Sequence, residues 1–206
     1  MTVTVTYHLS DLILELNRLF NIFNSKFFND KLEQPVIVVQ SSRKKRTLGT
    51  CSVNRIWIQK ASEDTNAKYE ISISAEYLNR PIEDICATLI HEMVHLHCGL
   101  NNIKDTSNNY VYHNKKFKEQ AEARGLIIEH AKTIGWSVTT LKPETREYIQ
   151  TLNVNQQPFE YYRRGAIGIP VKITETLTKS EKLNRLYIRM EKIRAKIQKL
   201  EAEKDG

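Results

Sequence analysis

The chain has 206 residues, of which 40% are hydrophobic, enough for one well-formed core with an appended segment. Its formal net charge of +7 favours acidic partners such as nucleic acid. No stretch approaches the ~20 apolar residues of a membrane span, and residues 1–8 lack the pattern of a secretion signal, so we expect a cytoplasmic protein without a membrane partner. Cys51, Cys86 and Cys98 lack Cys-x-x-Cys spacing and are expected to be reduced, buried thiols.

The sequence of the first third of the chain predicts one helix and three strands. Apolar residues at three- and four-residue spacing indicate a helix over residues 10–28, capped by Ser10. Short, β-branched or alternating segments then predict strands over residues 35–40, 51–58 and 69–74. Between the first two lies the basic cluster Arg43, Lys44, Lys45 and Arg46, which fits either phosphate contacts or an ordinary solvated loop tip.

A second helix is predicted over residues 81–98, with Pro81 at its first position and Gly99 as its stop. The polar content of residues 101–112 indicates a loop. Residues 114–124 then read as a further helix, with His113 at its entrance. The sequence therefore predicts an α+β fold with a small sheet of about three strands.

The C-terminal third divides into two segments. Residues 141–178 contain three prolines and no sustained periodicity, which predicts an irregular connector. Residues 179–204 show the apolar seam of a coiled-coil-like helix, with eight basic residues against Glu181 and Glu191 between positions 179 and 199. This basic amphipathic helix suits phosphate binding, self-association or docking on the preceding domain equally well.

Chemistry is carried by His91-Glu92-Met93-Val94-His95 in the second helix. Positions four apart lie on one helical face, so His91 and His95 can direct ring nitrogens at a single cation, which we expect to be Zn²⁺. Glu92 projects beside that face, where it can accept a proton from an attacking water and pass it to the leaving amine. The alternative is a pair of incidental surface histidines, which the amphipathic setting disfavours.

A catalytic zinc site needs a third protein ligand. His113 is the preferred residue, because it follows a loop long enough to reverse the chain. Glu119 and Glu122, one and two turns further along the same helix, are its competitors. The remaining histidines, His8, His97 and His130, are interpreted as structural or exposed.

With these residues placed, residues 10–136 resemble the SprT-like zinc metallopeptidase family, which is Spartan-related. The resemblance rests on residues 80–95 and on residues 113–117, supported by weaker matches at residues 23–32 and 47–52. It implies a zincin-like α+β domain over residues 1–140, followed by the connector and by the helix of residues 179–204. It also implies His91, His95 and His113 as zinc ligands and Glu92 as the general acid and base.

The resemblance favours a metallopeptidase that acts on DNA-associated or DNA-crosslinked proteins, with DNA recruited through basic segments. The chain departs from the family pattern at Asn114, where glycine is usual, and in having no cysteine after Cys98 to build a zinc ribbon. Tyr110 or Tyr112 is a candidate for stabilising the oxyanion. The alternative function is a non-catalytic, zinc-stapled adaptor that binds nucleic acid or protein.

Overall fold

The computed structural model describes residues 8–42, 46–60 and 66–164, all within a unit that extends from Met1 to Val171. Its elements in chain order are α1 (Leu9–Phe28), β1 (Val36–Gln40), β2 (Gly49–Cys51), β3 (Glu70–Ser74), η1 (Ala75–Tyr77), α2 (Ile82–Leu100), β4 (Thr106–Ser107), β5 (Tyr112–His113), α3 (Lys115–Glu122), β6 (Leu126–Ala131), β7 (Gly135–Leu141), α4 (Pro143–Thr151) and η2 (Gln157–Phe159). None of the helices in the described ranges has the length and apolar character needed to cross a membrane. The helix expected over residues 179–204 and the basic residues Arg43, Lys44 and Lys45 lie outside the described residues.

The first sheet has three strands, the number that the sequence predicts, and their order is β1-β3-β2. β1 runs parallel to β3, whereas β2 runs antiparallel to it. Ile37, Ile71 and Ile73 point from this sheet into the core. The core also receives fully buried side chains from α1, among them Phe20 and Phe23. Burying this apolar surface is the main favourable contribution to the fold.

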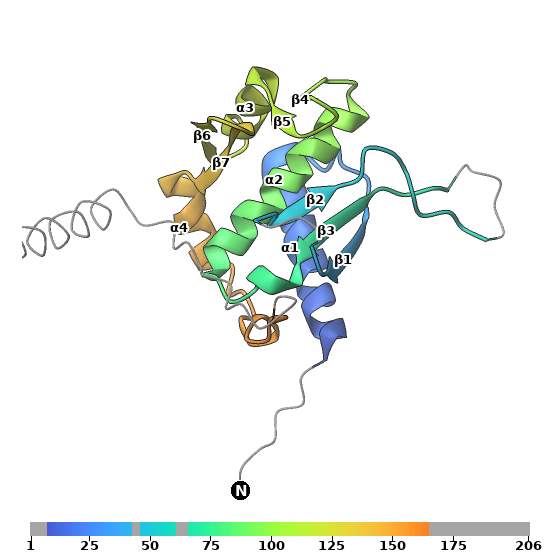
Figure 1. The fold of residues 1–206 in the computed structure, drawn as a ribbon. Helices are drawn as coiled ribbons and strands as arrows, with labels where there is room; N and C mark the ends of the chain where they lie inside the picture. Colours follow the sequence, from blue (N-terminus) through green and yellow to red (C-terminus); the bar gives the residue numbers. More distant parts are fainter. Residues whose placement is uncertain (1–7, 43–45, 61–65, 165–206) are drawn as a thin grey trace, which may run out of the picture. The chain divides into compact units, whose positions relative to one another are not determined.

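Helix α2 runs between the two sheets (Figure 1). Twelve of its residues are buried, from Ile85 to Cys98, so the helix is covered on most of its circumference. It contacts β2 and β3 on one side and β7, α3 and α4 on others. A helix enclosed in this way provides a rigid base for the residues that it carries.

A second sheet, which the sequence did not predict, has the strand order β4-β5-β7-β6. β6 and β7 form an antiparallel hairpin, and the two-residue strand β5 joins β7 through the parallel pair His113 and Gly135. Gly135 has φ +73°, and a Cβ there would lie 2.2 Å from the carbonyl oxygen of His113. Only glycine therefore permits this close pairing.

Several element boundaries differ from the predictions, among them those of β2, α1 and α2. β2 covers Gly49–Cys51 instead of residues 51–58. Beyond it, Val53, Ile56 and Ile58 are exposed on an arm whose backbone pairs with Lys68 through Ile56 and Trp57. α1 begins at Leu9 after His8, so Ser10 lies in the first turn and is not the cap. α2 extends through Gly99 to Leu100, and Pro81 precedes its first residue.

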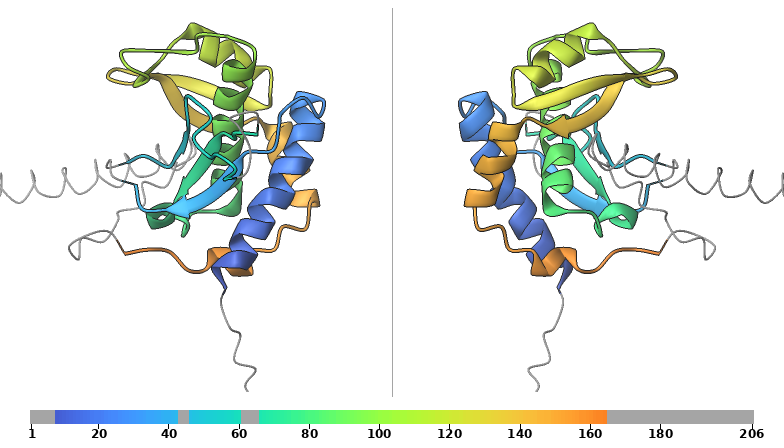
Figure 2. Two further views of the ribbon diagram at one scale, coloured as in Figure 1. Left: turned by 90° about the vertical axis from the view of Figure 1, so that its right-hand side faces the viewer. Right: turned by 90° about the vertical axis from the view of Figure 1, so that its left-hand side faces the viewer.

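The irregular connector predicted from residue 141 is wrong over Pro143–Thr151, which form α4. Pro143 occupies the first helical turn, where its missing N–H has no cost. α4 lies beside α1 (Figure 2), and the Tyr148 ring meets Phe27 edge to face with 6.2 Å between centroids. Ile149 and, further on, Phe159 are buried in the common core. The folded unit thus continues past residue 140.

Candidate metal centre

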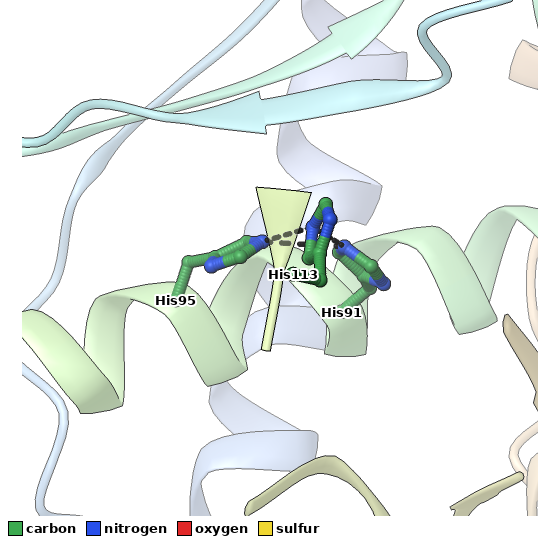
Figure 3. A group of neighbouring side chains, drawn as sticks. All are labelled: His91, His95 and His113. Carbon is green, nitrogen blue, oxygen red and sulfur yellow. Dashed lines mark hydrogen bonds between the residues drawn. The ribbon is translucent and has the colours of Figure 1, made fainter. Parts of the chain in front are cut away.

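Three imidazoles converge on one point, two from α2 and one from β5 (Figure 3). The Nε2 atom of His91 lies 3.2 Å from those of His95 and His113, and the last two are 3.1 Å apart. His91 is buried, while His95 and His113 are partly buried. The structure therefore brings together the three histidines that the sequence singles out.

Each of these imidazoles has a partner on its other nitrogen. The Nδ1 atom of His95 lies 2.6 Å from an Asp105 carboxylate oxygen, and that of His113 lies 3.3 Å from the carbonyl oxygen of Ile134. Both partners can only accept, so each Nδ1 carries the hydrogen. His91 Nδ1 lies 2.7 Å from the Thr139 hydroxyl, which itself donates to the carbonyl oxygen of Ser137.

The consequence is that all three Nε2 atoms present lone pairs to the same small space. Lone pairs at such separations repel one another unless a cation lies between them. Nitrogen ligands of a tetrahedral Zn²⁺, at 2.0–2.1 Å from the metal, are separated by about 3.3 Å, close to the distances found here. The donor set, its spacing and its outer partners therefore fit a divalent metal such as zinc.

The pKa values of two of these histidines suit metal binding. Burial, followed by the neighbouring His95 and His113, holds the pKa of His91 well below its usual range. Burial also lowers the pKa of His113 to about 4, with a smaller contribution from His95. Both rings are consequently neutral at neutral pH, the state in which an imidazole nitrogen binds a metal.

Phe117 forms the apolar base of the centre. Its fully buried ring, on the first turns of α3, lies 4.6 Å from the rings of His91 and His95 and 4.7 Å from that of His113. One side chain thus contacts all three imidazoles. This packing restricts their rotation and excludes water from the side that the Phe117 ring covers.

The side chain of Glu92 extends from α2 toward β2. Its side chain is 5% exposed, and a Cβ added to Gly49 would lie 3.0 Å from the Glu92 Cγ and Oε1 atoms, so this glycine leaves the space that the carboxylate uses. Burial raises the pKa of Glu92 to about 7, opposed by His95 and by the backbone N–H of Cys51, which donates to the carboxylate. Glu92 is therefore suited to gaining and losing a proton near neutral pH.

The other candidates for the third metal ligand lie outside the group of three histidines. Glu119 is exposed, and Glu122 pairs with Lys118 at 3.5 Å, so neither belongs to the convergent group. The Tyr112 hydroxyl lies 3.0 Å from His130 Nε2, and Tyr110 is 66% exposed. Neither tyrosine has a contact with the three histidines among the interactions described.

Two functional neighbours were missed by the sequence analysis, namely Asp105 and Thr139. Asp105 lies in a stretch predicted only as a polar loop, and Thr139 in a strand that was not predicted. Asp105 follows His95 by ten positions, and no spacing rule marks either residue. An acidic residue between the second and third histidines is the one available signal, since metal-bound imidazoles commonly donate to carboxylates.

Comparison with known proteins gives one family. The model of the SprT-like family matches residues 16–135, a segment that contains α2, the three histidines and Gly135. No curated protein matches the chain significantly. The match covers more than half of the chain and agrees in position with the metal centre, and on this basis the chain belongs to the SprT-like family.

Proposed function

We propose that this protein is a zinc-dependent metallopeptidase that hydrolyses peptide bonds, with His91, His95 and His113 as zinc ligands and Glu92 as the general acid and base. The observation that carries the proposal is the convergence of three Nε2 lone pairs beside a buried carboxylate. A structural zinc site is usually closed by four protein ligands. The group found in the described residues has three, which favours catalysis over a zinc-stapled adaptor.

Zinc held by His91, His95 and His113 would supply a Lewis acid, the chemistry that activates water for attack on a peptide carbonyl. Glu92 accepts the proton that this water loses and then delivers it to the nitrogen of the leaving amine. Burial raises the pKa of Glu92 above its usual range, which makes the carboxylate a stronger base for the first of these transfers. The N–H of Cys51 donates to the carboxylate, and Gly49 leaves the space that the carboxylate occupies.

An extended polypeptide is the substrate that the surroundings favour. Among the described strands, β2 lies at one edge of its sheet, and its residue Gly49 lies next to the Glu92 side chain. A peptide can add to such an edge through main-chain hydrogen bonds. The arm that continues from β2 (Figure 1) exposes Ile56, Trp57 and Ile58, which suits contacts with apolar side chains of an unfolded segment.

DNA-associated or DNA-crosslinked proteins are the substrate class that we propose. The net charge of +7 and the basic residues around Arg46 support attraction to nucleic acid. The basic segment of residues 179–204 is the proposed recruiting or self-associating element, and we propose a cytoplasmic location for the protein. The adaptor alternative predicts a salt-sensitive DNA complex without proteolysis.

The protein loaded with one equivalent of zinc should cleave a denatured protein, and a chelator should abolish the cleavage until zinc is restored. Within this assay Gly49→Ala should lower the rate by about tenfold or more, because a Cβ 3.0 Å from the Glu92 Cγ and Oε1 atoms displaces the carboxylate from its working position. Zinc content should not change, since the atoms nearest to the added Cβ belong to Glu92 and Thr88 and not to the histidines.

Gly99→Ala is the matched control. It introduces the same methyl group into the helix that carries Glu92, but nothing lies within 4 Å of the new Cβ. Its activity should equal that of the unsubstituted protein, and its stability should rise by up to about 1 kcal/mol because alanine favours helix. Equal rates for the two alanine variants would argue against the placement of Glu92. Cleavage that persists in the metal-free protein would refute the proposed function.

A further inference from the structure

Asn114, the residue after His113, makes hydrogen bonds with both polar atoms of its side chain. The Oδ1 atom accepts from the backbone N–H groups of Lys116 at 2.8 Å and Phe117 at 3.2 Å, which caps α3. The Nδ2 atom donates to the carbonyl oxygen of Lys104 at 2.8 Å. The backbone N–H of Asn114 donates to the carbonyl oxygen of Asp105 at 3.0 Å.

These four bonds connect three separate parts of the metal centre. Asp105 supplies the carboxylate that accepts from His95. Phe117 carries the ring that packs under all three imidazoles. His113, covalently joined to Asn114, is the ligand that comes from outside α2. A displacement at residue 114 therefore moves the third ligand, the outer carboxylate and the aromatic base together.

The remaining connections between these parts are few. β4 and β5 are two-residue strands that pair only Thr106 with His113 and Ser107 with Tyr112. β5 joins β7 through a single residue pair. Lys104 and Asp105 precede β4 and lie outside this ladder. The side chain of Asn114 is thus a principal tie between the Asp105 segment and α3.

We propose that Asn114 is a positioning residue that fixes the distance between His113 and Asp105, and so sets the geometry and strength of metal binding. The proposal rests on the metal centre of the proposed function. Asn114 has φ −93° and ψ −176°, a conformation open to any residue, so its backbone does not require glycine. A glycine here would keep the backbone bond to Asp105 and lose the three side-chain bonds.

The test is Asn114→Asp, which separates the two roles of the side chain. An aspartate retains the oxygen that caps α3 and is itself a preferred capping residue, so the N-terminus of α3 should stay capped in the metal-free protein. It cannot donate to Lys104 and places a carboxylate oxygen against that carbonyl. Zinc affinity, measured by competition with a chromogenic chelator, should weaken by about tenfold, as for other outer-shell changes.

Two further readouts report on the geometry of the centre and on the local opening of the segment that Asn114 holds. The visible absorption of the Co²⁺-substituted protein should shift in Asn114→Asp, because the three imidazoles no longer hold their relative angles. Hydrogen exchange at the Asn114 amide, measured without metal, should become faster as the Asp105 segment loosens. Asn114→Gly should show both effects together with a lower melting temperature, since it also removes the cap.

Asn101→Asp is the control, because Asn101 Nδ2 likewise donates to a backbone carbonyl, that of His97 at 2.8 Å, at the end of α2. It should leave zinc affinity, Co²⁺ absorption and Asn114 exchange unchanged. If Asn114→Asp matches the unsubstituted protein in all three readouts, the positioning role is refuted. Failure of the unsubstituted protein to bind zinc would refute the metal centre instead, and the exchange measurement would still decide whether Asn114 holds the Asp105 segment.

Discussion

Glu92→Gln should lower the rate of cleavage by about 10²- to 10⁴-fold while leaving zinc content unchanged. Glutamine has nearly the same shape and fits the space beside Gly49, but its amide cannot take a proton from the attacking water. General acid and base catalysis contributes typically 10²- to 10⁴-fold, so the turnover number should fall by about that factor. The measurement is the initial rate of cleavage of a denatured protein, together with elemental analysis of the same sample.

A control for this substitution is Glu76→Gln, which also changes a buried carboxylate. Glu76 is 7% exposed, accepts from Ser41 and the N–H of Ser42, and pairs with Arg163, away from the three histidines. It should lose stability but keep its cleavage rate per folded molecule. Full activity in Glu92→Gln would eliminate Glu92 as the base.

Removing the third imidazole should have the largest effect on the metal. In His113→Ala two histidines of one helix remain, and zinc affinity should fall by more than about 100-fold, because changes to outer-shell partners alone cost 10- to 100-fold. After dialysis the zinc content should drop from one equivalent per chain to near zero. Elemental analysis measures this directly.

Glu119→Ala and Glu122→Ala distinguish His113 from its competitors on α3. Glu119 is exposed and Glu122 pairs with Lys118, so both variants should retain one equivalent of zinc. Zinc retained in His113→Ala and lost in either glutamate variant would transfer the third ligand position to that carboxylate.

The part of the site that the sequence predicts best is the part set by local geometry. His91 and His95 are four residues apart on a helix with a strong apolar face, so their common direction follows from the helical repeat alone. His113 was predicted from the length of the loop and from the family resemblance, and its convergence on the other two could only be seen in the fold. Asp105 and Thr139 depend entirely on tertiary contacts, which no local pattern encodes.

The missing elements of the fold have a similar explanation. β6 alternates buried Leu126 and Ile128 with exposed neighbours over only six residues, a weak signal beside the strong helical periodicity of α2. α4 is short and polar, and its helical state is supported by packing of Ile149 and Tyr148 against the core and α1. The strand predicted over residues 51–58 had the right alternation, yet its side chains reach solvent on the arm.

The central claim is that three imidazoles hold one zinc ion, and X-ray absorption at the zinc edge tests it most directly. Full-length protein carrying one equivalent of zinc should show three imidazole nitrogens and one further light atom at about 2.0–2.1 Å. Sulfur at about 2.3 Å, contributed by a residue such as Cys51 or Cys98, would contradict the account. So would a spectrum with only two imidazoles and a carboxylate.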